Sequence, residues 1–122
     1  ARRLYRASVI RNPKVVESYL NLGIMAYEEG KLAAAMAQYK LGLRSHWPSG
    51  TLHYNLAGLY LRQQLWADAA HHFREATRID PKFLPAFLGL ASAEWRKGDK
   101  PAAAAAAYAA LRMDPARPEG YR

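Results

Sequence analysis

The sequence predicts an all-α fold, a right-handed superhelical solenoid built of antiparallel helix hairpins. Ala and Leu dominate the apolar half of the composition while β-branched residues are scarce, which favours helix over strand. The chain also matches itself at a shift of 34 residues through three successive units without a gap. A period of this length is typical of stacked helical hairpins, because one hairpin cannot cover its own apolar face.

The repeat register divides the chain into units at residues 16–49, 50–83 and 84–117. We expect residues 1–15 to form the second helix of a truncated repeat and residues 118–122 to start a further helix. Two anchors define the register, one of them in each half of the unit. They are Leu22-Gly23, Leu56-Ala57 and Leu90-Ala91 in the first half, and Ala35, Ala69 and Ala103 in the second.

Each unit predicts two helices, because apolar residues recur at helical spacing on both sides of a breaker. In the first unit the helices are expected at 17–29 and 33–45, separated by Gly30. In the second they are expected at 51–63 and 67–79, separated by Gln64. In the third they are expected at 85–97 and 101–113, separated by Gly98 and Asp99. Pro48, Pro81 and Pro115 end the units, since proline has no amide to donate.

These positions resemble the tetratricopeptide repeat family, whose pattern combines small residues, aromatic residues and a terminal proline. The first two units follow it through Tyr19, Leu22, Gly23, Ala26, Ala35, Tyr39 and Gly42, and through Leu56, Ala57, Tyr60, Ala69, Phe73, Ala76 and Pro81. The third unit departs from it, with Glu94 in place of tyrosine and Ala107 in place of an aromatic residue. A buried carboxylate needs a partner, so we expect either looser packing there or pairing of Glu94 with Arg62 or Arg96.

The sequence offers few groups for catalysis or metal binding. It has no cysteine, and its histidines, His46, His53, His71 and His72, do not have the spacing of a converging zinc set. It lacks a nucleophile elbow and a phosphate-binding loop. We therefore expect no enzymatic activity, no cofactor and no metal.

Charge and hydropathy set limits on the partners. Of the net charge of +8, residues 1–15 carry Arg2, Arg3, Arg6, Arg11 and Lys14 with no acid, so the bases do not form a stripe along the body. Nucleic acid is therefore a secondary hypothesis. No apolar run is long enough to span a membrane. The compartment stays open between cytoplasm and periplasm, and the Ala- and Arg-rich usage favours a bacterial source.

The resemblance implies a non-catalytic scaffold that binds a protein or peptide in a concave groove lined by the first helices. The alternatives are self-association through open repeat ends, where Leu4, Val9 and Ile10 form an apolar face, and a basic nucleic-acid-binding surface. Carried over position by position, the family's groove residues are Asn21, Ile24, Tyr27, Tyr54, Asn55, Gly58, Leu61, Arg62, Leu88, Ser92, Trp95 and Arg96.

Overall fold

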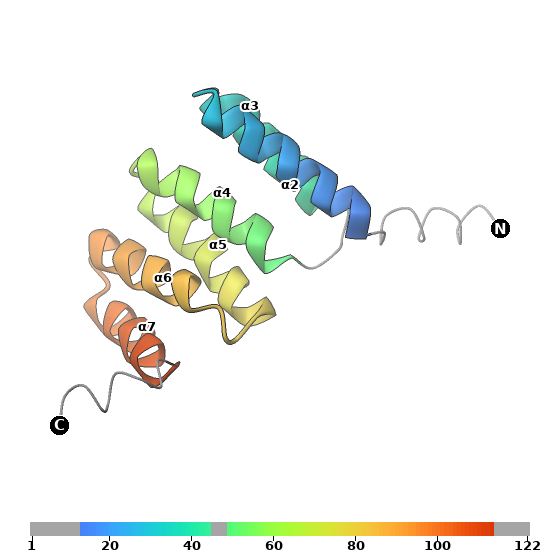
Figure 1. Cartoon of the computed structure of the whole chain (residues 1–122). Helices are drawn as coiled ribbons and strands as arrows, with labels where there is room; N and C mark the ends of the chain where they lie inside the picture. The colour runs from blue at the N-terminus through green and yellow to red at the C-terminus, as the bar shows by residue number, and fades with distance from the viewer. Residues whose placement is uncertain (1–12, 45–48, 114–122) are drawn as a thin grey trace.

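The computed structural model describes residues 13–44 and 49–113, and these ranges form six helices. The helices are α2 (Pro13–Glu28), α3 (Leu32–Leu43), α4 (Gly50–Arg62), α5 (Trp66–Ile79), α6 (Leu84–Lys97) and α7 (Lys100–Met113). They form three antiparallel hairpins that follow one another through the stack (Figure 1). The all-α prediction is confirmed. The helices expected within residues 1–15 and at 118–122 lie wholly or largely outside the described residues.

The breakers predicted from the sequence separate the two helices of each hairpin. Gly30 and Gly98 have φ angles of +80° and +99°, and Gln64 has a φ angle of +63°. A left-handed residue ends a helix because it turns the chain away from the helical path. Side chains cap the start of two helices: Ser49 Oγ, before α4, accepts from the Leu52 amide at 3.1 Å, and Asp99 Oδ1, before α7, accepts from the Ala102 amide at 3.1 Å.

The first helix starts earlier than expected, at residue 13 instead of 17. Proline is tolerated in the first turn of a helix, since the amide that it lacks has no partner there. Val16 is also buried and continues the apolar face of α2 towards its start. The sequence pattern was therefore shorter than the helix that it belongs to.

Two apolar clusters hold the stack together, and α4 belongs to both. One cluster joins α2, α3 and α4 around Tyr39, Leu52 and Leu56. The other joins α4, α5, α6 and α7 around Phe73 and Leu90. The hairpins are thus connected by a core that continues from one to the next, as expected for a solenoid.

The expected partners of Glu94 were wrong. Its carboxylate is only 1% exposed, and its Oε2 atom accepts from Arg74 Nη2 on α5. Its Oε1 atom lies 3.1 Å from Lys97 Nζ, as an ion pair without hydrogen-bond geometry. Arg62 and Arg96 lie over the rings of Tyr27 and Trp66 instead. The side of α6 that carries Glu94 faces α5, and position in the sequence alone does not show this.

Candidate partner-binding grooves

A groove of about 800 Å³ crosses the first helices of all three hairpins, α2, α4 and α6. We call it the central groove. Nine of the twelve predicted site residues line it: Ile24, Tyr27, Tyr54, Asn55, Gly58, Leu61, Arg62, Leu88 and Ser92. Its wall is mainly apolar and aromatic, with a few polar groups, which is the usual composition of a ligand site in proteins.

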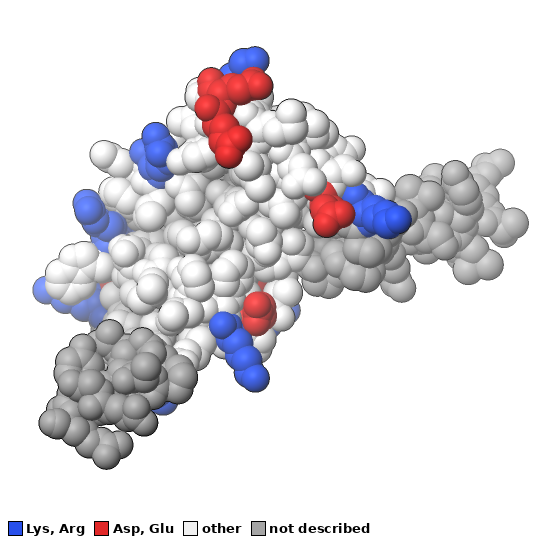
Figure 2. All heavy atoms as spheres, in the orientation of Figure 1, with Lys and Arg blue, Asp and Glu red and all other residues white. Residues whose placement is uncertain are grey.

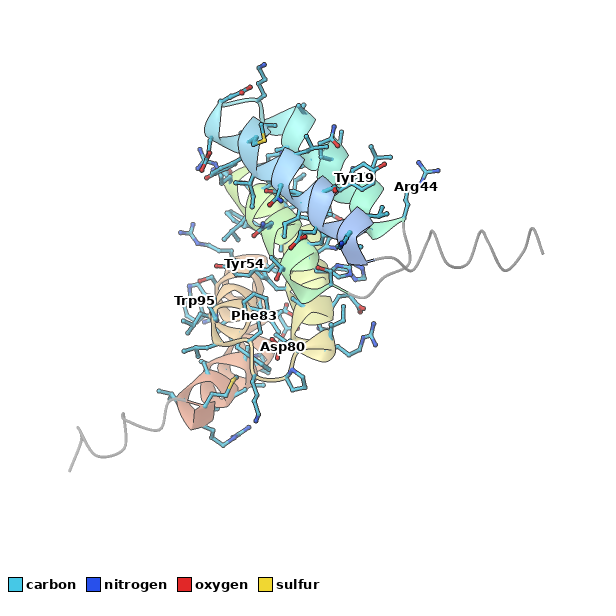
Figure 3. All side chains as sticks on the ribbon, turned by 45° about the vertical axis from the view of Figure 1, so that its right-hand side comes forward. Tyr19, Arg44, Tyr54, Asp80, Phe83 and Trp95 are labelled. Atoms are coloured by element: carbon cyan, nitrogen blue, oxygen red, sulfur yellow. The ribbon has the colours of Figure 1, made fainter. Side chains whose placement is uncertain are left out.

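Aromatic packing holds the Tyr54 side chain in the central groove. Its ring centroid lies 5.0 Å from that of Phe83 and 5.7 Å from that of Phe73. Figure 3 shows Tyr54 and Phe83 on the same side of the ribbon as Trp95, away from Tyr19 and Arg44. The ring of Tyr54 is half-buried, so packing fixes its position while part of it still faces the groove.

Tyr27 and Arg62 join the first two hairpins across one end of the groove. Arg62 Nη1 donates to the Tyr27 hydroxyl at 2.9 Å, and the guanidinium carbon lies 5.5 Å from the ring centroid. Both side chains are exposed, so the contact is weak and can open. No ion pair occupies Arg62 within the described ranges, which leaves its charge available to a carboxylate.

Asn55 connects the groove to the buried face of α3. Burial raises the pKa of the Tyr39 hydroxyl, and a hydrogen bond with the Asn55 side chain acts in the opposite direction. Nearby, Gly58 leaves open space, because a Cβ atom added there would meet nothing within 4 Å. The central groove therefore contains the polar side chain of Asn55 and has open space beside Gly58 in the middle of α4.

Six lining residues lie outside the twelve predicted ones: Glu28, Tyr39, Leu59, Phe73, Pro85 and Gly89. Tyr39 and Phe73 belong to second helices, which the family pattern assigns to the core. The ring of Phe73 packs against Gly89 of the following first helix, and the ring of Tyr39 packs against Gly23 of its own hairpin. The sequence shows these glycines, but it does not show which aromatic rings pack against them.

The remaining predicted residues lie elsewhere. Asn21 is exposed on α2 and lines neither hollow. Trp95 and Arg96 line a second hollow of about 700 Å³ between α6 and α7, which we call the terminal hollow. Its lining consists of Ala91, Ser92, Trp95, Arg96, Lys100, Ala103, Ala104 and Ala107. The predicted set is thus divided between two hollows that share Ser92.

A family model described as tetratricopeptide repeat matches residues 1–50, 37–82 and 54–118, nearly the whole chain. The chain belongs to the tetratricopeptide repeat family. The comparison with curated protein sequences finds no match.

Solved tetratricopeptide structures are similar in fold. The second tetratricopeptide domain of Spaghetti (RPAP3), bound to the HSP90 peptide SRMEEVD, is 24% identical, with a TM-score of 0.81 over 93% of this chain and 97% of that one. The Arabidopsis OM64 domain is 24% identical, with a TM-score of 0.76 over 84% of each chain. The N-terminal domain of stress-induced protein-1 from C. elegans is 19% identical, with a TM-score of 0.75 over 84% of this chain and 87% of that one. Identities of this size show the fold alone.

The described tetratricopeptide units contain a histidine pair away from both hollows. His53 Nδ1 on α4 and His72 Nδ1 on α5 lie 3.0 Å apart, so one ring donates and the other accepts. No group of three or more His, Cys, Asp or Glu side chains that could hold a metal occurs in the described ranges. The pair is therefore a contact between two helices of one hairpin.

Charged side chains do not form a single basic band on the face shown in Figure 2, where they are scattered around the edge and the middle is mostly uncharged. None of the described helices is long and apolar enough to cross a membrane. In the lining of the central groove, the charged side chains are those of Glu28 and Arg62.

Proposed function

We propose that this tetratricopeptide domain is a protein-interaction scaffold that holds a peptide or partner segment in the central groove. The observation that carries the proposal is that one continuous groove receives side chains from three successive first helices. An extended or helical segment is the shape of ligand that contacts several repeats at once. The two Spaghetti domains that share this fold were solved with a peptide of HSP90, which supports a peptide as the class of ligand.

The lining favours a ligand with apolar anchors. Ile24, Leu61 and Leu88 offer aliphatic surface, and Leu88 is 53% exposed. Tyr27 and Tyr54 add aromatic surface with hydroxyl groups that can bond a peptide backbone. Such rigid amphipathic side chains contribute strongly to binding because they lose little entropy.

The position of Arg62 at the edge of the groove favours a ligand that carries a carboxylate next to its apolar anchors. A guanidinium group binds a carboxylate with two parallel hydrogen bonds. The Tyr27 hydroxyl holds Arg62 at the edge of the groove until such a ligand replaces it. Ile24 of α2 adds apolar surface to the same groove, so apolar anchoring should dominate here.

The test selects peptides from a random display library on the intact chain and measures the Kd of the selected peptides by calorimetry. Gly58→Phe would fill open space in the groove, and Leu88→Asp would remove an exposed anchor. We expect each change to weaken binding at least tenfold, about 1.4 kcal/mol. Leu41→Asp is the matched control, because Leu41 is exposed on α3 and lines neither hollow.

The groove is excluded as the binding site if the selected peptides bind both groove variants as tightly as they bind the unmodified chain. Equal weakening by Leu41→Asp would instead indicate loss of fold. Circular dichroism of all three variants separates this case from a specific effect.

A further inference from the structure

The second helices of the second and third hairpins differ in how much of one equivalent face is buried. α5 and α7 occupy the same place in the repeat, 34 residues apart. On α5 the face of Ala69, Ala70 and Phe73 is buried beneath α6 and neighbouring apolar residues, whereas the matching face of α7 keeps only Ala103 buried and leaves Ala104 and Ala107 exposed. Within the described ranges no helix covers this side of α7 as α6 covers α5.

A missing ring makes the terminal hollow. Phe73 of α5 fills the space beside Gly89 so closely that a Cβ atom there would lie 2.4 Å from its Cε1 atom. The equivalent residue of α7 is Ala107, which has no ring to offer an incoming helix. Its place is part of the hollow of about 700 Å³, with the exposed Trp95 as one wall. A helix that docks on this face can therefore place a bulky side chain of its own in the hollow.

An exposed apolar stripe extends the hollow along α7. Ala104, Ala107, Tyr108 and Leu111 are spaced at i, i+3, i+4 and i+7, so they lie on one face of the helix. Tyr108 is 62% exposed and Leu111 is 42% exposed. A stripe of this spacing matches the apolar stripe of another helix, and its alanines allow the two backbones to come close.

The rim of the hollow is cationic. Lys100 Nζ lies 5.5 Å from the ring centroid of Trp95, and Arg96 Cζ lies 5.4 Å from that of Trp66. In the part of the chain that the structure describes, neither cation forms an ion pair with a carboxylate. α7 itself contains no Asp or Glu. A second copy of this face would bring like charges together, whereas an acidic partner would be attracted.

The contact between α5 and α6 also combines an apolar helix interface with a pair of opposite charges. There a docked helix presents its apolar side to alanines and an aromatic ring, and its Glu94 carboxylate meets the cationic Arg74. In that contact the cation lies on the covered helix, at the position equivalent to Tyr108 of α7, whereas at the terminal hollow the cations Arg96 and Lys100 lie on the rim.

We infer that the terminal hollow and the α7 stripe dock an amphipathic helix of a partner protein, which inserts one bulky apolar side chain beside Ala107 and places Asp or Glu residues against Arg96 and Lys100. This surface is separate from the central groove apart from Ser92, and the inference does not rest on the proposed function.

The experiment uses two fluorescein-labelled peptides of about 18 residues, long enough to form a helix. Both carry Phe and Leu at i, i+3, i+4 and i+7 on an alanine background, and they differ only in flanking glutamates or lysines. Fluorescence anisotropy with the intact chain should show the glutamate peptide binding at least tenfold more tightly. Ala107→Phe, which fills the hollow as Phe73 does in α5, should weaken that binding at least tenfold.

Charge reversal supplies a second variant that does not depend on filling the hollow. Arg96→Glu with Lys100→Glu should transfer the preference to the lysine peptide. Lys31→Glu with Arg44→Glu is the matched control, since both residues are exposed in the first hairpin. This pair should leave the preference unchanged, and circular dichroism verifies the fold of each variant.

Three outcomes would overturn the inference. The first is no binding of either peptide, or equal binding of both. The second is tight binding that Ala107→Phe does not weaken. The third is sedimentation equilibrium showing a dimer that Ala107→Phe dissociates, because that result assigns the face to a second copy. Peptides that bind the central groove do not confuse the readout, since Gly58→Phe should leave this binding intact.

Discussion

Two contacts between neighbouring hairpins pair residues by size and polarity. Tyr39 of α3, which carries a hydroxyl, meets the Asn55 side chain of α4. Phe73 of α5, which lacks one, meets Gly89 of α6. Asn55 and Gly89 occupy equivalent positions in the repeat, so the side chain on the incoming helix matches the ring that it covers. This satisfies the buried hydroxyl in one place and avoids a steric conflict in the other.

Helical glycines should respond to alanine in opposite directions. A Cβ atom at Gly23 would lie 2.3 Å from Tyr39 Cε1, and one at Gly89 would lie 2.4 Å from Phe73 Cε1. We expect Gly23→Ala and Gly89→Ala to lower the free energy of unfolding by roughly 1–3 kcal/mol, because overpacking outweighs the gain in helix propensity. Gly58→Ala meets open space and should raise it by about 1 kcal/mol. Urea unfolding followed by circular dichroism measures all three.

The glycine prediction fails if Gly23→Ala is as stable as the unmodified chain. That result would mean that the Tyr39 ring moves aside at little cost. Gly58→Ala is the internal control, since it makes the same chemical change in the middle of a helix without a neighbour.

At the scale of helices, the sequence predicted the order of the six described helices and, apart from the start of α2, their ends to within two residues. These features depend on local periodicity and on breakers such as Gly30 and Gly98. Side-chain contacts between neighbouring helices were harder to predict. Glu94 was expected to pair with Arg62 or Arg96, yet its carboxylate points to Arg74 across the α5–α6 contact. Such a contact depends on how one hairpin is rotated against the next, which the repeat pattern does not encode.

The candidate site was likewise predicted only in part. First-helix positions such as Tyr54 and Leu61 were predicted to line a groove because the family pattern fixes which helix side faces inward, and the structure brings them together. Trp95 was assigned to the same groove but lines the terminal hollow. It lies near the end of α6, where the wall of the groove is set by packing in three dimensions and not by sequence position.

The His53–His72 contact should make the second hairpin sensitive to acid. Burial lowers the pKa of His72 from 6.5 to about 4, with smaller contributions from His53 and His71, and burial also lowers the pKa of His53. The folded chain therefore binds fewer protons than the unfolded chain between these two values. Its stability is full above pH 6.5 and falls as the pH decreases towards 4.

Because the rings are half-exposed, we expect the loss to be about 1 kcal/mol for the pair. Thermal unfolding at neutral pH and at pH values below 6 measures it. His72→Gln should flatten the acid-dependent part of the curve, whereas His71→Gln, at an exposed neighbour on the same helix, should not. An unchanged pH dependence in His72→Gln would contradict this account.

For the molecule as a whole, position in the stack should decide how firmly each helix is held. α4 and α5 are packed on both sides, because the two apolar clusters meet at α4 and α6 covers α5. Among the described helices, α7 packs mainly against α6, and its contact surface is mostly alanine. Since a repeat array is stabilised by contacts between neighbours, a helix with one described neighbour should open more readily than helices packed between two.

Amide hydrogen exchange under native conditions should therefore give lower opening free energies in α7 than in α4 and α5. Phe73→Ala removes the ring that joins α5 to α6 and should lower stability by about 3–5 kcal/mol. Its effect should be larger on exchange in α5, α6 and α7 than in α2 and α3, because Phe73 belongs to the second cluster. Leu52→Ala, in the first cluster, should reverse that order. Equal loss of protection in every helix for both variants would show instead that the three hairpins unfold as one unit, with the two clusters acting as a single core.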